Sequence, residues 1–159
     1  MKTDNIITAL KCLLAIIVCS PSIALSENLF RNGDMSTASG WRGDRSFVEL
    51  DGQRVLELKS NPRREQLFFQ DVKTGRIKDV VLTFQYMSND YAGRGLQLLG
   101  ERTDGSHTYR NLDLKVDGQW HDCTWHFSEI RGSRSMIFRF KLLEGNGSVF
   151  FRDVVLKEK

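Results

Sequence analysis

The most constraining feature of this 159-residue sequence is a period of two in its apolar residues, interrupted at short intervals by turn residues. Over 79–87, for example, Val80, Leu82, Phe84 and Tyr86 share one face, which is the pattern of a half-buried strand. The same alternation predicts strands over 45–50, 54–59, 65–73, 79–87, 94–102, 107–116, 120–128, 136–142 and 148–157. Turn pairs such as Asp-Gly at 51–52, 104–105 and 117–118 separate them, because these residues tolerate the positive φ of tight turns. The pattern therefore predicts an all-β fold, an antiparallel β-sandwich or jelly roll.

The first 26 residues have the organisation of a signal peptide. Lys2 and Lys11 supply positive charge, residues 12–19 form a short apolar run, and small residues at 24–26 precede a cut at Glu27. The apolar run is shorter than the roughly 20 residues that a membrane-spanning helix needs. We therefore expect a signal peptide at 1–26, a single domain at 27–159 without a membrane span, and a secreted or extracytoplasmic protein, periplasmic or extracellular.

Charge and cysteine content narrow the function classes. The expected signal peptide contains two of the 23 basic and one of the 20 acidic side chains, so the remaining domain has a net charge of only +2. A nucleic-acid partner is not expected, because such proteins have a basic footprint. Cys12 and Cys19 lie in the signal peptide, which leaves Cys123 without an intramolecular disulfide partner. The domain must therefore be held together by its packed core, and Cys123, inside an apolar alternation, is predicted to be a buried, inert thiol.

Motifs at the two ends of the expected domain point to a family. Asn32-Gly33-Asp34 is followed by Gly40-Trp41, and the sequence closes with an alternating strand, FFRDVVL, at 150–156. Together with Gln70-Asp71-Val72 in the middle, these motifs resemble the carbohydrate-binding modules of the galactose-binding-like β-sandwich superfamily, which includes cellulose- and xylan-binding modules. The resemblance implies first and last strands that lie side by side. It also implies a secreted, lectin-like, non-catalytic module that recognises a polysaccharide or glycoconjugate on a concave sheet face.

Candidate binding residues follow from the strand alternation. A sugar has apolar C–H faces and a rim of hydroxyls, so its site needs an aromatic ring together with amide, carboxylate or guanidinium groups. If the apolar side chains of each strand face the core, the side chains that alternate with them face outward and supply the candidate binding residues. Tyr91, in a loop, could stack on a sugar beside them. The predicted carbohydrate-binding residues are Gln85, Gln97, Tyr109, Asn111, Arg139 and Tyr91. A polar sheet face also fits an ordinary solvated surface, and the sequence does not decide between the two.

The resemblance implies one further group, a structural calcium ion held between the opening loop and the closing strand. Asp34 and Asp153 are the candidate ligands. Two departures weaken this expectation, since Ser36 and Arg152 stand where the family commonly has acidic residues, and calcium takes six to eight oxygen ligands. No other cofactor is expected.

Two other functions remain open from the sequence. A jelly-roll polysaccharide lyase could use His107, Tyr109 and Arg110, but Tyr109 and Arg110 would point to opposite faces of one strand. A structural or adhesive sandwich would bind a protein instead and would expose an apolar patch. Carbohydrate-binding modules commonly accompany a catalytic domain, so a separately encoded glycan-active enzyme is an expected partner.

Overall fold

The computed structural model describes residues 27–128 and 134–159, and every regular element in this part of the chain is a β-strand. The signal peptide predicted at 1–26 lies outside the described residues. No described helix is long and apolar enough to cross a membrane. The strands are β1 (Arg42–Gly43), β2 (Ser46–Leu50), β3 (Gln53–Lys59), β4 (Gln66–Lys73), β5 (Val80–Met87), β6 (Ala92–Gly93), β7 (Leu96–Arg102), β8 (His107–Leu112), β9 (His121–Phe127), β10 (Ser135–Leu142), β11 (Gly145–Asn146) and β12 (Ser148–Glu158).

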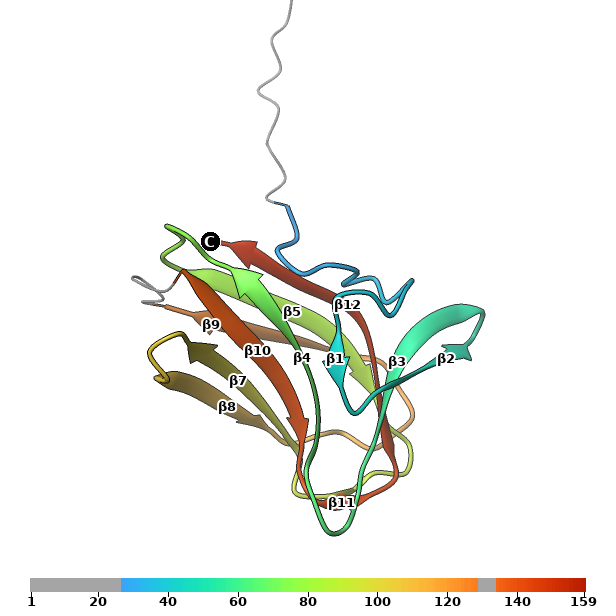
Figure 1. Ribbon diagram of the computed structural model, residues 1–159. Coiled ribbons are helices and arrows are strands. Elements are labelled where there is room, and N and C mark those ends of the chain that lie inside the picture. The colour runs from blue at the N-terminus through green and yellow to red at the C-terminus, as the bar shows by residue number, and fades with distance from the viewer. Residues whose placement is uncertain (1–26, 129–133) are drawn as a thin grey trace, which may run out of the picture.

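Two antiparallel five-stranded sheets form the two layers of a sandwich (Figure 1). Sheet A has the order β1-β4-β10-β7-β8, and sheet B has the order β2-β3-β12-β5-β9. Strands distant in sequence are neighbours in both sheets, as when β12 pairs with β3 and β5. The predicted all-β sandwich is therefore confirmed, and the sheet order is that of a jelly roll rather than of simple hairpins.

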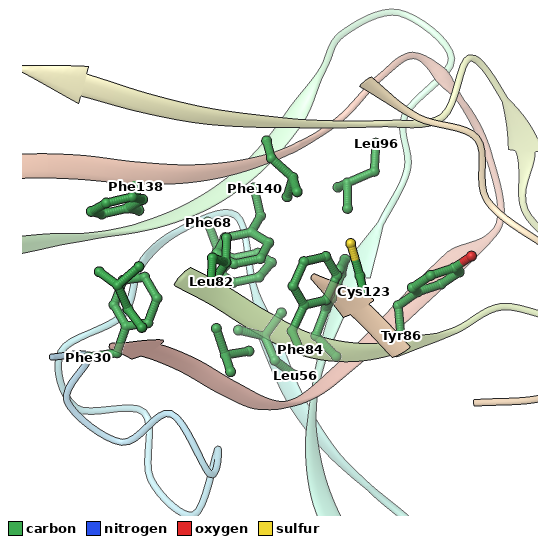
Figure 2. Close-up of a cluster of buried hydrophobic side chains, with 14 of the residues drawn as sticks. Phe30, Leu56, Phe68, Leu82, Phe84, Tyr86, Leu96, Cys123, Phe138 and Phe140 are labelled. Atoms are coloured by element: carbon green, nitrogen blue, oxygen red, sulfur yellow. The ribbon is translucent and has the colours of Figure 1, made fainter. Parts of the chain in front are cut away.

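The core lies between the sheets and is rich in phenylalanine (Figure 2). Phe68 of β4 and Phe140 of β10 stack with ring centroids 4.5 Å apart, and Phe84 of β5 and Phe151 of β12 meet Phe140 edge-on from the other sheet. Such edge-to-face pairs are a favoured aromatic arrangement. Trp41 is also buried, and its ring contacts both Phe68 and Phe140.

Side-chain amides attach the N-terminal segment to this core. The Asn28 side chain donates to the Val154 carbonyl and accepts from the Leu156 amide, and the Val154 amide donates to the Gly33 carbonyl. Gln70 of β4 binds the backbone of Arg31 from the other sheet. The opening segment therefore runs beside β12, near the C-terminus in Figure 1, but it forms no strand there. The first strand, β1, pairs with β4 in sheet A and not with the last strand, β12, so the neighbouring first and last strands that the family resemblance implied are not found.

Two details of the strand prediction are wrong. The strand predicted at 107–116 ends at Leu112, and Val116 beyond it is exposed rather than in the core. In β3 both faces are buried over 55–58, whereas half-burial was expected. The carboxylate of Glu57 tolerates this burial because the hydroxyls of Ser46 and Ser148 donate to it.

Candidate functional site

The outer face of sheet A, which points away from sheet B, carries four of the six predicted binding residues. Its central row crosses all five strands through aligned residues of β1, β4, β10, β7 and β8: Arg42, Phe69, Arg139, Leu99 and Tyr109. On one side a second row contains Leu67, Lys141, Gln97 and Asn111. On the other side a third row contains Asp71, Ile137, Glu101 and His107.

Tyr109 is the most exposed large apolar side chain in the described part of the chain. It retains 58% of its accessible surface, because β8 is the edge strand of sheet A and its residues before Leu112 are exposed. The His107 ring lies near the Tyr109 ring, at a centroid distance of 6.4 Å. An exposed, nearly unpacked ring on a sheet face is the kind of surface on which the C–H face of a pyranose can stack.

Amide groups lie beside this ring. Gln97 of β7 donates from Nε2 to Oδ1 of Asn111 on β8, over 3.0 Å, and the pair is exposed. Each amide keeps donors and acceptors beyond this one bond, which suits it to the mixed donor and acceptor character of sugar hydroxyls.

The charges on the face are arranged in ion pairs. Arg139 donates from Nε and Nη2 to Oε2 of Glu101, at 3.0 and 2.7 Å, Arg42 pairs with Asp71, and Lys141 contacts Glu65 at 3.0 Å. Three cations are thus matched by three carboxylates. The three rows therefore present oriented polar groups and little net charge.

The ring of Phe69, on the same face, contacts two of these cations. The guanidinium groups of Arg139 and Arg42 lie 5.1 and 4.8 Å from its centroid, within cation–π range. Phe69 and Arg42 are not among the binding residues predicted from the sequence. In β4 the buried residues alternate with outward-facing ones, and Phe69 is at an outward-facing position. This alternation could have identified Phe69 as a surface residue, but a phenylalanine in a strand is usually assigned to the core.

Gln85 does not belong to this face, contrary to the prediction. It lies on β5 in sheet B, where it points outward and contacts Arg152 and Asp122 at 2.7 and 2.9 Å. The alternation of β5 correctly predicted that the Gln85 side chain faces outward. The alternation within one strand does not, however, show which sheet that strand belongs to.

Tyr91 is buried, whereas the sequence suggested an exposed loop residue. Its Oη accepts from the Gly95 amide at 3.0 Å and lies 3.1 Å from the Leu143 carbonyl, and burial raises the pKa of the phenol. Tyr91 therefore fastens the turn before β7 to the end of β10.

The candidate calcium ligands lie near each other in a poor environment for a cation. Asp34 and Asp153 line one hollow of about 300 Å³ together with Arg54 and Arg152, so two guanidinium groups accompany the two carboxylates. Arg54 donates to the Ser36 carbonyl, at 3.2 Å, and thereby occupies one of the backbone oxygens of the opening loop. Within the described residues, no cluster of three or more His, Cys, Asp or Glu could hold a metal. These residues do not fit a calcium ion with its six to eight oxygen ligands.

The remaining tryptophan, cysteine and histidine side chains near β9 lie outside the face of sheet A described above. Cys123 faces the core, as predicted, and Trp125 does so too. Burial raises the pKa of the Cys123 thiol, which keeps it protonated and inert. His121 bonds Asp117 through Nε2 at 2.8 Å, whereas His126 is exposed on the opposite side of β9. Trp120, which directly precedes β9, is half-buried.

The edge of sheet A that ends with β1 has a second feature, a hollow of about 600 Å³. It is lined by residues from the opening segment and from β1, β4 and β10: Arg31, Gly40, Trp41, Arg42, Asp71, Val72, Lys73 and Ser135. Arg42 and Asp71 belong both to this hollow and to the outer face of sheet A, so the two are continuous.

A scan against protein-family models and a search of curated proteins found no match. Solved structures do match. A family 16 carbohydrate-binding module aligns with a TM-score of 0.65 at 16% identity, over 82% of this chain and 100% of that one. A family 61 module, solved in complex with β-1,4-galactotriose, aligns with a TM-score of 0.58 at 15% identity, over 84% and 100%.

One similar structure is part of a larger protein. The enzymatically active domain of tailspike protein 4 from bacteriophage CBA120 aligns with a TM-score of 0.62 at 11% identity. The match covers 82% of this chain but spans only 21% of the tailspike chain. Modules of carbohydrate-binding families 4, 22 and 27 are further neighbours. At these identities the likeness concerns the fold, and this chain has the antiparallel β-sandwich fold of the carbohydrate-binding modules.

Proposed function

We propose that this protein binds a polysaccharide or glycoconjugate across the outer face of sheet A, without turnover. The observation that carries the proposal is the exposed ring of Tyr109, aligned through Leu99 with Arg139 and flanked by the Gln97–Asn111 amide pair. The ring would stack on a pyranose face, and the amides and the Arg139–Glu101 pair would bond its hydroxyls. The five-strand width of the face suits an extended chain rather than a single sugar.

The charge arrangement favours a neutral glycan. Each of the three cations in these rows has a carboxylate partner, which offsets the positive charge that would attract a uronate or sulfate group. Sugar hydroxyls can bind to both members of an ion pair without breaking it. We therefore expect weak dependence of affinity on salt concentration, because no counterion is displaced.

Binding without catalysis is supported by the separation of the reactive groups. The lyase alternative requires Tyr109 and Arg110 to act together, but the Arg110 guanidinium donates to the Thr124 carbonyl at 2.7 Å, at the edge of sheet B. A glycosidase requires two carboxylates across a cleft. Glu101 is held by Arg139, and Asp113, the other candidate, lies beyond the end of β8.

Export and partnership rest on the sequence. The signal peptide predicted at 1–26 would deliver the domain to an extracytoplasmic or extracellular location, where polysaccharides occur. A separately encoded glycan-active enzyme would be the natural partner, since a binding domain without catalytic groups can concentrate an enzyme on its substrate.

The test is retention of the purified protein on a panel of immobilised neutral and acidic polysaccharides, followed by titration. We expect retention on a neutral glycan and roughly tenfold weaker affinity for Tyr109→Ala, equivalent to about 1.4 kcal/mol. Tyr109→Phe, which keeps the ring, should bind nearly normally, and Arg139→Ala should bind weakly. The matched control is His126→Ala, an exposed substitution on sheet B. Retention that is unchanged in both Tyr109→Ala and Arg139→Ala would refute this site, and retention on no glycan would favour the protein-interaction alternative.

A further inference from the structure

A row of polar side chains also crosses the outer face of sheet B. Arg152 of β12 donates from Nε to Oε1 of Gln85 at 2.7 Å and from Nη1 to Oε1 of Gln53 at 2.8 Å. Gln85 of β5 in turn donates from Nε2 to Oδ1 of Asp122 on β9 at 2.9 Å. The row joins four adjacent strands of the sheet, and its order is β3-β12-β5-β9.

An aromatic ring lies against this row. The guanidinium of Arg152 is 4.0 Å from the centroid of the Trp120 ring, the shortest cation–π distance among the described residues. Trp120 directly precedes β9 and shares the outward parity of Asp122. Its neighbours on the face are Met87 and Phe150, which are aligned with each other and half-buried. Trp120 is the least buried tryptophan of the protein, since Trp41 and Trp125 are in the core.

The polar row retains unused bonding capacity. The two bonds from Arg152 use two of the five N–H donors of a guanidinium, and the bond to Asp122 uses one of its two oxygens. Gln53 is exposed and has its amide nitrogen as a further donor. Donors and acceptors thus alternate along the row beside an aromatic ring, which is the combination that adjacent sugar hydroxyls and an apolar sugar face require.

A hollow adjoins the row where the register of β12 shifts, between Arg152 and Val155. The hollow of about 300 Å³ described above is lined by Arg152 and Gln53 of the row, together with Arg54, Asp34 and Asp153. Its volume is at the lower end of the roughly 300–1,000 Å³ typical of small-molecule sites. Two guanidinium groups and two carboxylates line it, so it has no net preference for an anion or a cation.

We infer that the outer face of sheet B is a second saccharide-binding site, in which Trp120 stacks on a neutral sugar and Arg152, Gln85 and Asp122 bond its hydroxyls. This inference rests on the proposed function, because it assumes that the protein recognises glycans. The two sheets form opposite layers, so their outer faces point in opposite directions (Figure 1). One copy of the domain can therefore hold two separate polysaccharide chains and cross-link them.

The experiment is calorimetric titration of the purified protein with xylohexaose, cellohexaose and β-1,4-galactotriose. With at least one of these probes, we expect two equivalents of sugar per protein, one equivalent for Tyr109→Ala, one for Trp120→Ala and none for the double variant. Gln85→Ala provides an independent variant of the second site, in case Trp120→Ala disturbs folding, and should weaken that site at least tenfold. His126→Ala, on the same sheet face but outside the polar row, is the matched control.

The outcomes separate the two proposals. If Tyr109→Ala abolishes all binding while Trp120→Ala and Gln85→Ala bind as the unmodified protein does, the second site is refuted and the proposed function stands. If Trp120→Ala and Gln85→Ala abolish binding and Tyr109→Ala does not, the second site stands and the site on sheet A is refuted. A stoichiometry of one that no substitution changes, or no binding of any of the three probes, overturns both.

Discussion

Replacement of Gln70 by leucine tests how the N-terminal segment is attached to the sandwich. Gln70 is 3% exposed, and its amide binds both polar groups of one peptide unit: Oε1 accepts from the Arg31 amide at 2.7 Å, and Nε2 donates to the Arg31 carbonyl at 3.0 Å. Leucine preserves most of the volume but removes both bonds. Two partly buried backbone groups then lose their partner, at about 1–2 kcal/mol each, so Gln70→Leu should lower the free energy of unfolding by about 2–4 kcal/mol.

Thermal and urea unfolding measure this loss directly. For a domain of this size, a loss of 2–4 kcal/mol corresponds to a decrease in Tm on the order of 10 °C. Gln97→Leu is the matched control, because it makes the same change on an exposed sheet face where the amide bonds only another surface side chain, and it should change stability by less than about 0.5 kcal/mol. Equal stabilities of the two variants would show that Gln70 does not hold the segment.

Three further measurements follow from the structure. Addition of a chelator should leave Tm and glycan retention unchanged, because Arg54 and Arg152 accompany Asp34 and Asp153, and a chelator-induced decrease in Tm would show that a metal is bound there. The Cys123 thiol should react with a thiol reagent only after unfolding, since burial raises its pKa and blocks access, and rapid reaction of the folded protein would contradict this. Tyr91→Phe should destabilise the protein by about 1–3 kcal/mol in urea unfolding, because the Gly95 amide loses its buried acceptor, whereas Tyr109→Phe, at an exposed ring, should not.

The strand pattern was predictable because burial on one face imposes a period of two on the sequence. The predicted ranges 65–73 and 148–157 agree with β4 and β12 to within one residue at each end. The burial of Cys123, within the alternation of β9, was predictable for the same reason. These features depend only on residues close together in the chain.

The composition of each sheet face was not predictable, because it depends on which strands pair. Gln85 and Gln97 both occupy outward positions of alternating strands, yet β5 lies in sheet B and β7 in sheet A. Tyr91 follows Asn89 and Asp90, which favour an exposed turn, but its hydroxyl finds partners at Gly95 and at Leu143, 52 residues away. The long-range pairings of β7 with β10 and of β6 with β11 bring together the segments that surround Tyr91.

The role of Arg152 in the structure differs from the role that the sequence suggested. In the sequence it is a departure that weakens an expected calcium site. In the structure its guanidinium extends along the outer face of sheet B to Gln85, Gln53 and the Trp120 ring, while the attachment of the opening segment to β12 is made by Asn28 and Gly33. Hydrogen bonds therefore join the opening segment to β12 at the place where the resemblance implied a calcium ion. The Arg152 guanidinium is therefore free to bind Gln85, Gln53 and the Trp120 ring on the outer face of sheet B. The same side chain thus underlies both the expected insensitivity to chelator and the proposed second saccharide site.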